Sequence, residues 1–294
     1  MTETETPTEP ATGPEHAGAQ ESSSASSSAG TEAAPRPPRI SGVPADRRRA
    51  IVVGASSGIG EALVKRLAGE GYHVVGLARR KDKLEALASD CAEDCARTGG
   101  RVQVVEHDVI DTDQVSELFE RLVRDLGGLD LIVYAAGIMP AVELDEYDTT
   151  KDLEQVAINL EGCIAWCNAA ARLFQTQREG TIVGVSSIAG DRGRKGNPVY
   201  CTTKAAMATY LEALRNRLSE VGVHVCTIKP GFIDTPMTEG LEGLFWLISA
   251  DDAAKQILSA ARNHVNTRYV PVRWWLVGTI IKLIPSFLFR KLNI

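Results

Sequence analysis

The sequence has 294 residues, of which 44% are hydrophobic, so it is long and apolar enough to bury a core in one large or two ordinary domains. The 32 basic and 38 acidic residues give a formal net charge of -6, which argues against broad electrostatic binding to nucleic acid. No apolar run is long enough to span a bilayer, and the first residues lack the pattern of a secretory signal. These features predict a globular cytoplasmic protein.

The N-terminal region differs from the rest of the chain in composition. Residues 1–46 are mainly Ala, Ser, Thr, Glu, Gly and Pro and contain almost no large apolar side chain. Ordering this stretch would cost conformational entropy that no burial offsets. We therefore expect a disordered acidic tail before a single domain of residues 47–294.

Six short apolar or β-branched segments follow the tail, and each is typical of a strand. They lie at residues 50–53, 73–77, 101–105, 129–133, 181–185 and 223–228. Apolar strands separated by helix-length gaps indicate a parallel sheet covered on both faces, because antiparallel strands can return through tight turns. The pattern predicts an α/β fold with a doubly wound parallel sheet, the Rossmann fold.

A glycine-rich turn follows the first strand and precedes a segment of good helical composition. Its residues are Gly54, Ala55, Ser56, Ser57, Gly58, Ile59 and Gly60. Glycines permit a tight turn and let a pyrophosphate approach backbone amides at the N-terminus of a helix, where the helix dipole favours anions. The spacing Gly-x-x-x-Gly-x-Gly differs from the commoner Gly-x-Gly-x-x-Gly, but its place in an alternating domain predicts a dinucleotide site.

The end of the second strand indicates which dinucleotide binds. An acid there binds the ribose hydroxyls of NAD, whereas a basic residue binds the additional phosphate of NADP. The strand ends in Arg79 and Arg80 with no acid, and arginine offers a planar fork suited to phosphate. The alternative is that both arginines only begin a solvated helix with Lys81 and Lys83. We predict NADP(H), with NAD as the alternative.

A tyrosine and a lysine four residues apart begin a clear helical segment. In Tyr200-Cys201-Thr202-Thr203-Lys204, this spacing places the phenol and the ammonium on one face of the helix. A free tyrosine titrates near about 10 and exchanges protons poorly at neutral pH unless a cation stabilises its phenolate. We expect Lys204 to do this, although such spacing taken alone is usually an exposed helical pair.

Three further residues strengthen this interpretation. Ser186 and Ser187 follow the fifth strand, at the sheet edge where doubly wound folds bind ligands, and a serine there can donate a hydrogen bond to a substrate carbonyl. Asn159 lies inside an apolar helical stretch, where its amide requires a partner or a function. Holding a water molecule and satisfying the core are both open roles for Asn159.

With these residues, the sequence closely resembles the short-chain dehydrogenase/reductase family in its short, single-domain form. The resemblance covers about residues 49–235. Its motifs are the Gly54 to Gly60 turn, Asp108-Val109, Ala135-Ala136-Gly137, Asn159, Ser187, Tyr200, Lys204 and Pro230-Gly231-Phe232-Ile233-Asp234-Thr235. The chain departs from the family at Val53 and at Tyr134-Ala135, where changes in packing or sheet hydrogen bonding are expected but no chemical group is lost.

The resemblance implies cofactor roles for these residues. Asp108 and Val109 are implied to contact the adenine, Lys204 to hold the nicotinamide ribose, and Ile233 and Thr235 to fix the carboxamide. The full predicted cofactor set is Gly54, Ser56, Ser57, Gly58, Ile59, Gly60, Arg79, Arg80, Asp108, Val109, Ala136, Gly137, Tyr200, Lys204, Pro230, Gly231, Ile233 and Thr235.

The predicted reaction interconverts a carbonyl and a secondary alcohol by NADP(H)-dependent hydride transfer, with Tyr200 as acid/base. Ser187, chosen over Ser186 by its spacing to Tyr200, would hold the oxygen, Lys204 would tune the phenol, and Asn159 completes the catalytic set. The alternatives are a catalytically silent dinucleotide-binding regulator, against which the intact set argues, and an NAD-dependent alcohol dehydrogenase. No ligand cluster forms around the six cysteines, so no metal is expected.

The substrate region is less specific. Residues 191–198 are basic, and recognition of an anionic substrate competes equally with local pairing to Asp191. Residues 236–249 occupy the lid position of the family, and their apolar side chains favour a hydrophobic or lipid-like substrate.

The C-terminal segment is the least familiar part of the chain. Residues 272–294 combine Trp, Phe and Leu with Lys and Arg, which suits a pocket wall, a homo-oligomer interface or an amphipathic segment on a membrane. We favour packing or assembly over peripheral membrane contact.

Overall fold

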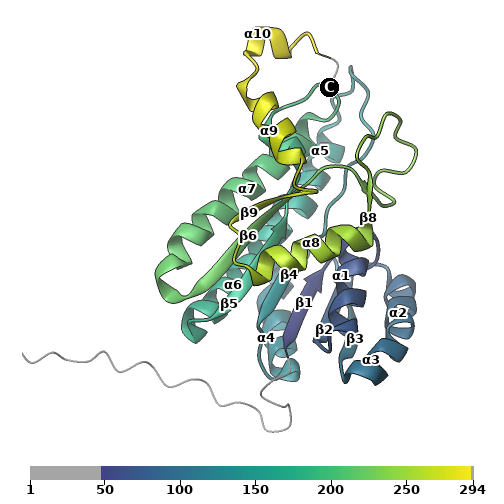
Figure 1. Ribbon diagram of the computed structural model, residues 1–294, viewed down its shortest axis with the longest axis vertical. Helices are drawn as coiled ribbons and strands as arrows, with labels where there is room; N and C mark the ends of the chain where they lie inside the picture. The colour runs from purple at the N-terminus through teal and green to yellow at the C-terminus, as the bar shows by residue number, and fades with distance from the viewer. Residues whose placement is uncertain (1–47, 293–294) are drawn as a thin grey trace, which may run out of the picture. The chain divides into compact units, whose positions relative to one another are not determined.

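The computed structural model describes residues 48–292, so the predicted tail of residues 1–46 lies outside the described part of the chain. The main sheet consists of β1 (Arg49–Val53), β2 (His73–Ala78), β3 (Arg101–Glu106), β4 (Leu131–Tyr134), β5 (Gly180–Val185), β6 (Val223–Pro230) and β9 (Thr267–Val270). All neighbouring strands are parallel, in the order β3-β2-β1-β4-β5-β6-β9 (Figure 1). The predicted doubly wound parallel sheet is confirmed, with the strand order reversing between β1 and β4.

Helices connect the strands. They are α1 (Gly58–Gly69), α2 (Lys81–Asp90), α3 (Ala92–Thr98), α4 (Val115–Leu126), α5 (Thr149–Val156), α6 (Gly162–Gln177), α7 (Pro198–Leu218), α8 (Ala250–Arg262), α9 (Trp274–Leu283) and α10 (Ser286–Phe289). Short helical turns are η1 (Thr112–Gln114), the π-helix η2 (Ala157–Glu161), η3 (Ile188–Asp191) and η4 (Ser219–Val221). A two-stranded pair, β7 (Ile233–Asp234) and β8 (Ile248–Ser249), brackets most of the segment predicted as a lid.

Successive residues of the central strands point to two separate cores. Ala50 and Val52 pack with α1, α2 and α8, whereas Ile51 and Val53 pack with α4, α6 and α7 on the other face. All four side chains are fully buried. Because both faces of the sheet are covered, β1 is apolar at every position after Arg49.

One strand of the main sheet escaped the sequence prediction. β9 pairs with β6 at the edge of the sheet, from Thr227 opposite Thr267 to Pro230 opposite Val270. The strand has only four residues, and Thr267 and Arg268 make half of it polar. Its conformation follows from pairing with β6 rather than from its own composition.

Candidate active site

The glycine-rich turn lies at the carboxyl ends of β1 and β4. Gly54 has a φ of +90°, and a Cβ on it would lie 2.4 Å from the backbone nitrogen of Ala136. A Cβ on Gly60 would lie 2.0 Å from the carbonyl oxygen of Gly54. Ser57 precedes the first residue of α1, Gly58, so the first amides of α1 have no partner within the helix. The turn therefore has no room for side chains at Gly54 and Gly60. Its free backbone amides could bind a pyrophosphate.

The two arginines after β2 contact different neighbours. Arg80 donates from Nη2 to the hydroxyls of Ser56 and Ser57, both over 2.8 Å. A nitrogen of Arg79 lies 3.6 Å from a carboxylate oxygen of Asp108, and the Arg79 side chain is 54% exposed. α2 begins directly after this pair. The Arg80 guanidinium thus lies beside the turn, whereas that of Arg79 pairs with Asp108.

Other predicted cofactor residues lie beside the same turn. A Cβ on Gly58 would lie 2.9 Å from the Thr235 methyl carbon, so the segment after β6 closes against the start of α1. Ile233 is buried in the core that contains α1, and the partly buried Ile59 packs against that core. Val109 is buried on the opposite face of the sheet. Segments from the ends of several strands therefore meet at the turn.

Helix α7 carries the tyrosine and lysine in its first two turns. Asn197 caps this helix by accepting a hydrogen bond from the Tyr200 amide, and Pro198 is its first residue. Lys204 Nζ donates to the carbonyl oxygen of Val185 over 3.0 Å and lies 5.7 Å from the centre of the Tyr200 ring. Tyr200 is 7% exposed and Lys204 is 3% exposed. The two residues share a buried face and do not form an exposed helical pair.

The two serines after β5 have different partners. Ser186 Oγ donates to the carbonyl oxygen of Lys204 over 2.7 Å, which ties β5 to the backbone of α7. Ser187 Oγ accepts from the Ala189 amide over 3.1 Å, and the Ser187 side chain also forms a hydrogen bond with that of Tyr200. Ser187 is therefore the serine that meets the phenol.

Burial controls the titration of Tyr200 and Lys204. It raises the pKa of Tyr200 above the ordinary tyrosine value, and the hydrogen bond with Ser187 and the charge of Arg194 oppose the rise. Burial also lowers the pKa of Lys204 to about 8. Both shifts favour the neutral form, because a charged group loses hydration when it is buried. The phenol is therefore protonated at neutral pH, while Lys204 changes charge slightly above it.

Asn159 lies in the π-helix η2 and is fully buried. Its Oδ1 accepts from the Ile138 amide over 2.8 Å, and its Nδ2 donates to the Ile138 carbonyl over 3.0 Å and to Thr203 Oγ1 over 3.2 Å. Thr203 Oγ1 donates to the carbonyl oxygen of Tyr200 over 2.9 Å. A Cβ on Gly137 would lie 3.1 Å from Asn159 Oδ1. The amide is thus satisfied, and it links the loop after β4 to the helix that carries Tyr200.

One residue of this network was missing from the predicted site. Tyr134, at the end of β4, is fully buried, and its hydroxyl donates to the Ile158 carbonyl over 2.5 Å. A Cβ on Gly162 would lie 2.5 Å from that hydroxyl, so the glycine makes room for the phenol. The bond fixes the peptide group directly before Asn159. A tyrosine at the end of a buried strand needs a hydrogen-bond partner, and this was the available signal.

The basic segment before α7 is partly engaged in local contacts. Asp191, 2% exposed at its side chain, lies 2.5 Å from Lys229 Nζ and accepts from the Tyr269 hydroxyl over 2.7 Å. Arg192 Nη1 donates to the carbonyl oxygen of Ile281 over 2.8 Å. Local pairing therefore accounts for the first two charged residues of the segment.

Arg194 differs from its neighbours in this segment. Its Nε is buried and has no hydrogen-bond partner among residues 48–292. Its positive charge lowers the pKa of Tyr200 against the larger effect of burial. Arg194 is thus an uncommitted donor in the electrostatic environment of the phenol.

The C-terminal segment packs against the turn that follows Ser187. Trp274 of α9 clusters with Ile188 and Tyr269. Pro230 ends β6, and a Cβ on the next residue, Gly231, would lie 2.1 Å from the Trp274 ring. Ring centroids 4.8 to 5.7 Å apart join Phe232, Phe245, Trp246 and Trp274. The lid and the C-terminal segment therefore form one aromatic cluster beside the site.

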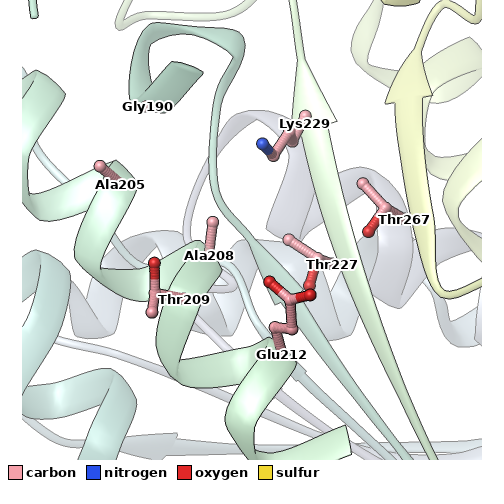
Figure 2. Close-up of a pocket in the computed structure, with 8 residues that line it drawn as sticks. All are labelled: Gly190, Ala205, Ala208, Thr209, Glu212, Thr227, Lys229 and Thr267. Atoms are coloured by element: carbon pink, nitrogen blue, oxygen red, sulfur yellow. The ribbon is translucent and has the colours of Figure 1, made fainter. Parts of the chain in front are cut away.

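A pocket of about 200 Å³ lies elsewhere, between α7 and the β6–β9 edge (Figure 2). Its lining residues are Gly190, Ala205, Ala208, Thr209, Glu212, Thr227, Lys229 and Thr267. None of the predicted site residues lines this pocket. Within residues 48–292, no group of three or more His, Cys, Asp or Glu side chains is placed to hold a metal ion.

Comparisons with known proteins agree with this arrangement. The family described as short chain dehydrogenase matches residues 48–243. An uncharacterized oxidoreductase of Staphylococcus aureus (strain N315) is 33% identical over 227 residues, covering 76% of this chain and 96% of that protein.

Two solved structures illustrate the shared fold. A short-chain type dehydrogenase/reductase from Mycobacterium marinum is 27% identical, with a TM-score of 0.68 and coverage of 75% of this chain and 91% of that one. A structure of ElxO with NADP bound is 24% identical, with a TM-score of 0.67 and coverage of 76% and 97%. At that identity, the likeness to ElxO is one of fold.

Proposed function

Because the chain belongs to the short-chain dehydrogenase family, oxidoreductases that bind a nicotinamide dinucleotide, we propose that it is an NADP(H)-dependent enzyme that interconverts a carbonyl and a secondary alcohol. The observation that carries the proposal is the buried, hydrogen-bonded set of Tyr200, Lys204, Ser187 and Asn159 at the carboxyl edge of the sheet. Within this set, Tyr200 is the acid/base residue.

The residues of the glycine-rich turn fit a dinucleotide. Close backbone contacts at Gly54 and Gly60 leave no room for side chains, and the free amides of α1 would hold the pyrophosphate. Asp108, which follows β3, is paired with Arg79. Arg79 and Arg80 would hold the additional phosphate of NADP, since an arginine fork binds phosphate oxygens well.

The proposed mechanism assigns each side chain one task. NADPH, when bound, supplies the hydride that reduces the carbonyl carbon. Tyr200 gives its phenolic proton to the carbonyl oxygen, and Ser187 donates a hydrogen bond to the same oxygen. Lys204 stabilises the resulting phenolate, and Asn159 holds the loop after β4 against α7. General acid catalysis of this kind contributes about two to four orders of magnitude.

We propose a hydrophobic or lipid-like small molecule as the substrate. Phe245 and Trp246 of the lid contact Trp274 beside the turn after Ser187, and apolar walls bind apolar ligands by burying their surface. Arg194 adds an uncommitted donor in the environment of Tyr200. A carbonyl compound with a large apolar part and one anionic group would use both features.

A substrate screen tests the proposed function. Purified protein and NADPH are combined with lipid, steroid, sugar and quinone carbonyls, and NADPH oxidation is followed by absorbance. We expect turnover of an apolar ketone or aldehyde, with at least about a tenfold preference for NADPH over NADH in kcat/KM. A similar preference for NADH would contradict the cofactor assignment. NADPH binding without turnover of any carbonyl would favour the silent dinucleotide-binding regulator.

A further inference from the structure

Exposed apolar side chains are concentrated in two segments. We call one set the tail surface; its members, each 37% to 75% exposed, are Val272, Trp275, Leu276, Ile280, Leu283, Phe287, Leu288 and Leu292. The lid contributes Met237, Leu241, Phe245, Trp246 and Leu247, each 38% to 50% exposed. Exposed apolar side chains concentrated in this way mark an interaction site, because apolar surface is costly to leave in water.

Helix α9 has apolar side chains both on the face that packs against the rest of the protein and on its exposed face. Trp274, Gly278 and Ile281 are buried, whereas Trp275 and Ile280 are more than half exposed. A helix that is apolar all round is normally covered on all sides. Among the described residues 48–292, the outer face of α9 therefore has no apolar partner.

The charged residues in the segment that carries the tail surface are all basic, and one of them, Lys282, pairs with the buried Asp191. Residues 265–292 contain five basic residues and no Asp or Glu, although the whole chain has a net charge of -6. Arg273 lies over the Trp246 ring at 5.1 Å, and Lys282 is 45% exposed. Arg290 and Lys291 follow α10, and both are exposed. The partner of the tail surface should therefore combine an apolar layer with negative charge.

We propose that the tail surface lies on an anionic lipid surface, with Trp275 and the aliphatic side chains among the acyl chains and the basic residues at the headgroups. Aromatic and aliphatic residues beside lysine and arginine are typical of interfacial helices. The core of an interface between two protein copies is instead depleted of lysine, and this segment carries Lys282 and Lys291. Within residues 48–292, no helix has the length and apolar composition to cross a bilayer, so the contact is at the surface.

Arg192, in the loop between η3 and α7, holds the segment that carries the tail surface. Arg192 donates to the backbone carbonyls of Ile281 and Ile284 and, over 3.3 Å, to Ser286 Oγ. Its guanidinium also lies 4.1 Å from the centre of the Phe289 ring. These contacts satisfy carbonyls at the end of α9 that have no helical partner. Figure 1 shows α9 and α10 together at one end of the described chain.

Vesicle cosedimentation tests the proposal without any assumption about the reaction. Full-length protein is mixed with vesicles of phosphatidylcholine alone, or of phosphatidylcholine and phosphatidylglycerol in equal parts. We expect sedimentation with the mixed vesicles, weakened by salt, and little with phosphatidylcholine alone. Absence of sedimentation, or equal sedimentation with both, would overturn the proposal.

Two double variants test whether the basic residues act at the tail surface in particular. Since each basic residue near an anionic surface strengthens binding about fivefold, Arg290→Gln with Lys291→Gln should weaken partitioning by roughly ten- to thirtyfold. The matched control is Arg121→Gln with Arg217→Gln, which removes two exposed charges from α4 and the last turn of α7. We expect no change in partitioning for the control, and an equal loss in both pairs would contradict a specific surface.

Quenching of tryptophan fluorescence in the wild-type protein tests the lipid contact without relying on variants that could fail to fold. Brominated phosphatidylcholine in the mixed vesicles should quench tryptophan fluorescence of the wild-type protein, and Trp275→Phe should remove most of that quenching.

Light scattering without lipid tests the alternative that the tail surface binds a second copy of the protein. If Trp275→Gln with Leu276→Gln converts an oligomer to a monomer and leaves sedimentation unchanged, the tail surface is an interface between copies and the lipid proposal is wrong.

Discussion

The region around Tyr200 and the tail surface lie next to each other but are built in opposite ways. Around Tyr200, Lys204, Asn159 and the two serines are buried, and their hydrogen bonds join β5, η2 and α7. On the tail surface, apolar side chains are exposed and the charges are uniformly basic. The difference indicates that the buried residues set the chemistry of the site, whereas the exposed residues set which surface the protein binds.

The sharpest test of the interior is removal of the phenolic hydroxyl. Tyr200→Phe should lower kcat/KM for carbonyl reduction by about two to four orders of magnitude, because the general acid is lost. NADPH affinity should change little. Tyr210→Phe is the control, since Tyr210 lies on the same helix and donates instead to Asn168 Oδ1 over 2.9 Å. Near wild-type turnover by Tyr200→Phe would remove Tyr200 from the mechanism.

Substitution of Arg80, which contacts the glycine-rich turn, tests the proposed NADP(H) preference. Arg80→Gln should raise the KM for NADPH by roughly ten- to a hundredfold, since a hydrogen bond to a charged group contributes about 1.5–3 kcal/mol. The KM for NADH should change far less, because NADH lacks the additional phosphate. Lys83→Gln is the control, because it removes a nearby positive charge and leaves Arg80 in place. Equal losses with both cofactors would show that Arg80 supports only the turn.

A pH profile tests whether burial of Lys204 matters for catalysis. Because burial lowers the pKa of Lys204 to about 8, its ammonium is present below that pH and is lost above it. We expect kcat/KM for reduction to be level at neutral pH and to fall by about tenfold per pH unit above about 8. In Lys204→Arg, any residual activity should lack this fall, because guanidinium stays charged. A wild-type profile level up to pH 10 would contradict a role for the ammonium.

The smallest expected effect on rate comes from Tyr134, which acts through another residue. Tyr134→Phe leaves the buried Ile158 carbonyl without its partner, which costs about 1–3 kcal/mol of folding free energy. We expect kcat to fall about three- to tenfold through misplacement of Asn159, with KM unchanged. Tyr147→Phe, at a side chain 89% exposed, should change neither value. A loss of thermal stability without any change in kcat would make the role of Tyr134 purely structural.

The features predicted from the sequence are those encoded by local spacing. The alternation of strands and helices, the glycine turn and the pair of Tyr200 and Lys204 each depend on neighbouring residues. The sheet prediction is confirmed, and the shared burial of that pair agrees with its spacing. The catalytic roles remain proposals.

The features that were missed depend on distant contacts. The bond from Tyr134 to Ile158 joins residues 24 apart, and the bond from Arg192 to Ile281 joins residues 89 apart. β9 adopts a strand because β6 offers a free edge, and the pKa of Lys204 follows from surroundings that only the folded chain creates. None of these contacts leaves a periodic signal in the sequence.

The buried carboxylate of Asp191 makes the C-terminal segment part of the folding unit. Its side chain is 2% exposed and pairs with Lys229, Tyr269 and Lys282, of which the last two follow the matched family region ending at residue 243. A recombinant protein shortened to that region would keep Lys229 but lose Tyr269 and Lys282 as partners of this carboxylate. Domain boundaries drawn from family similarity would therefore yield a less stable protein.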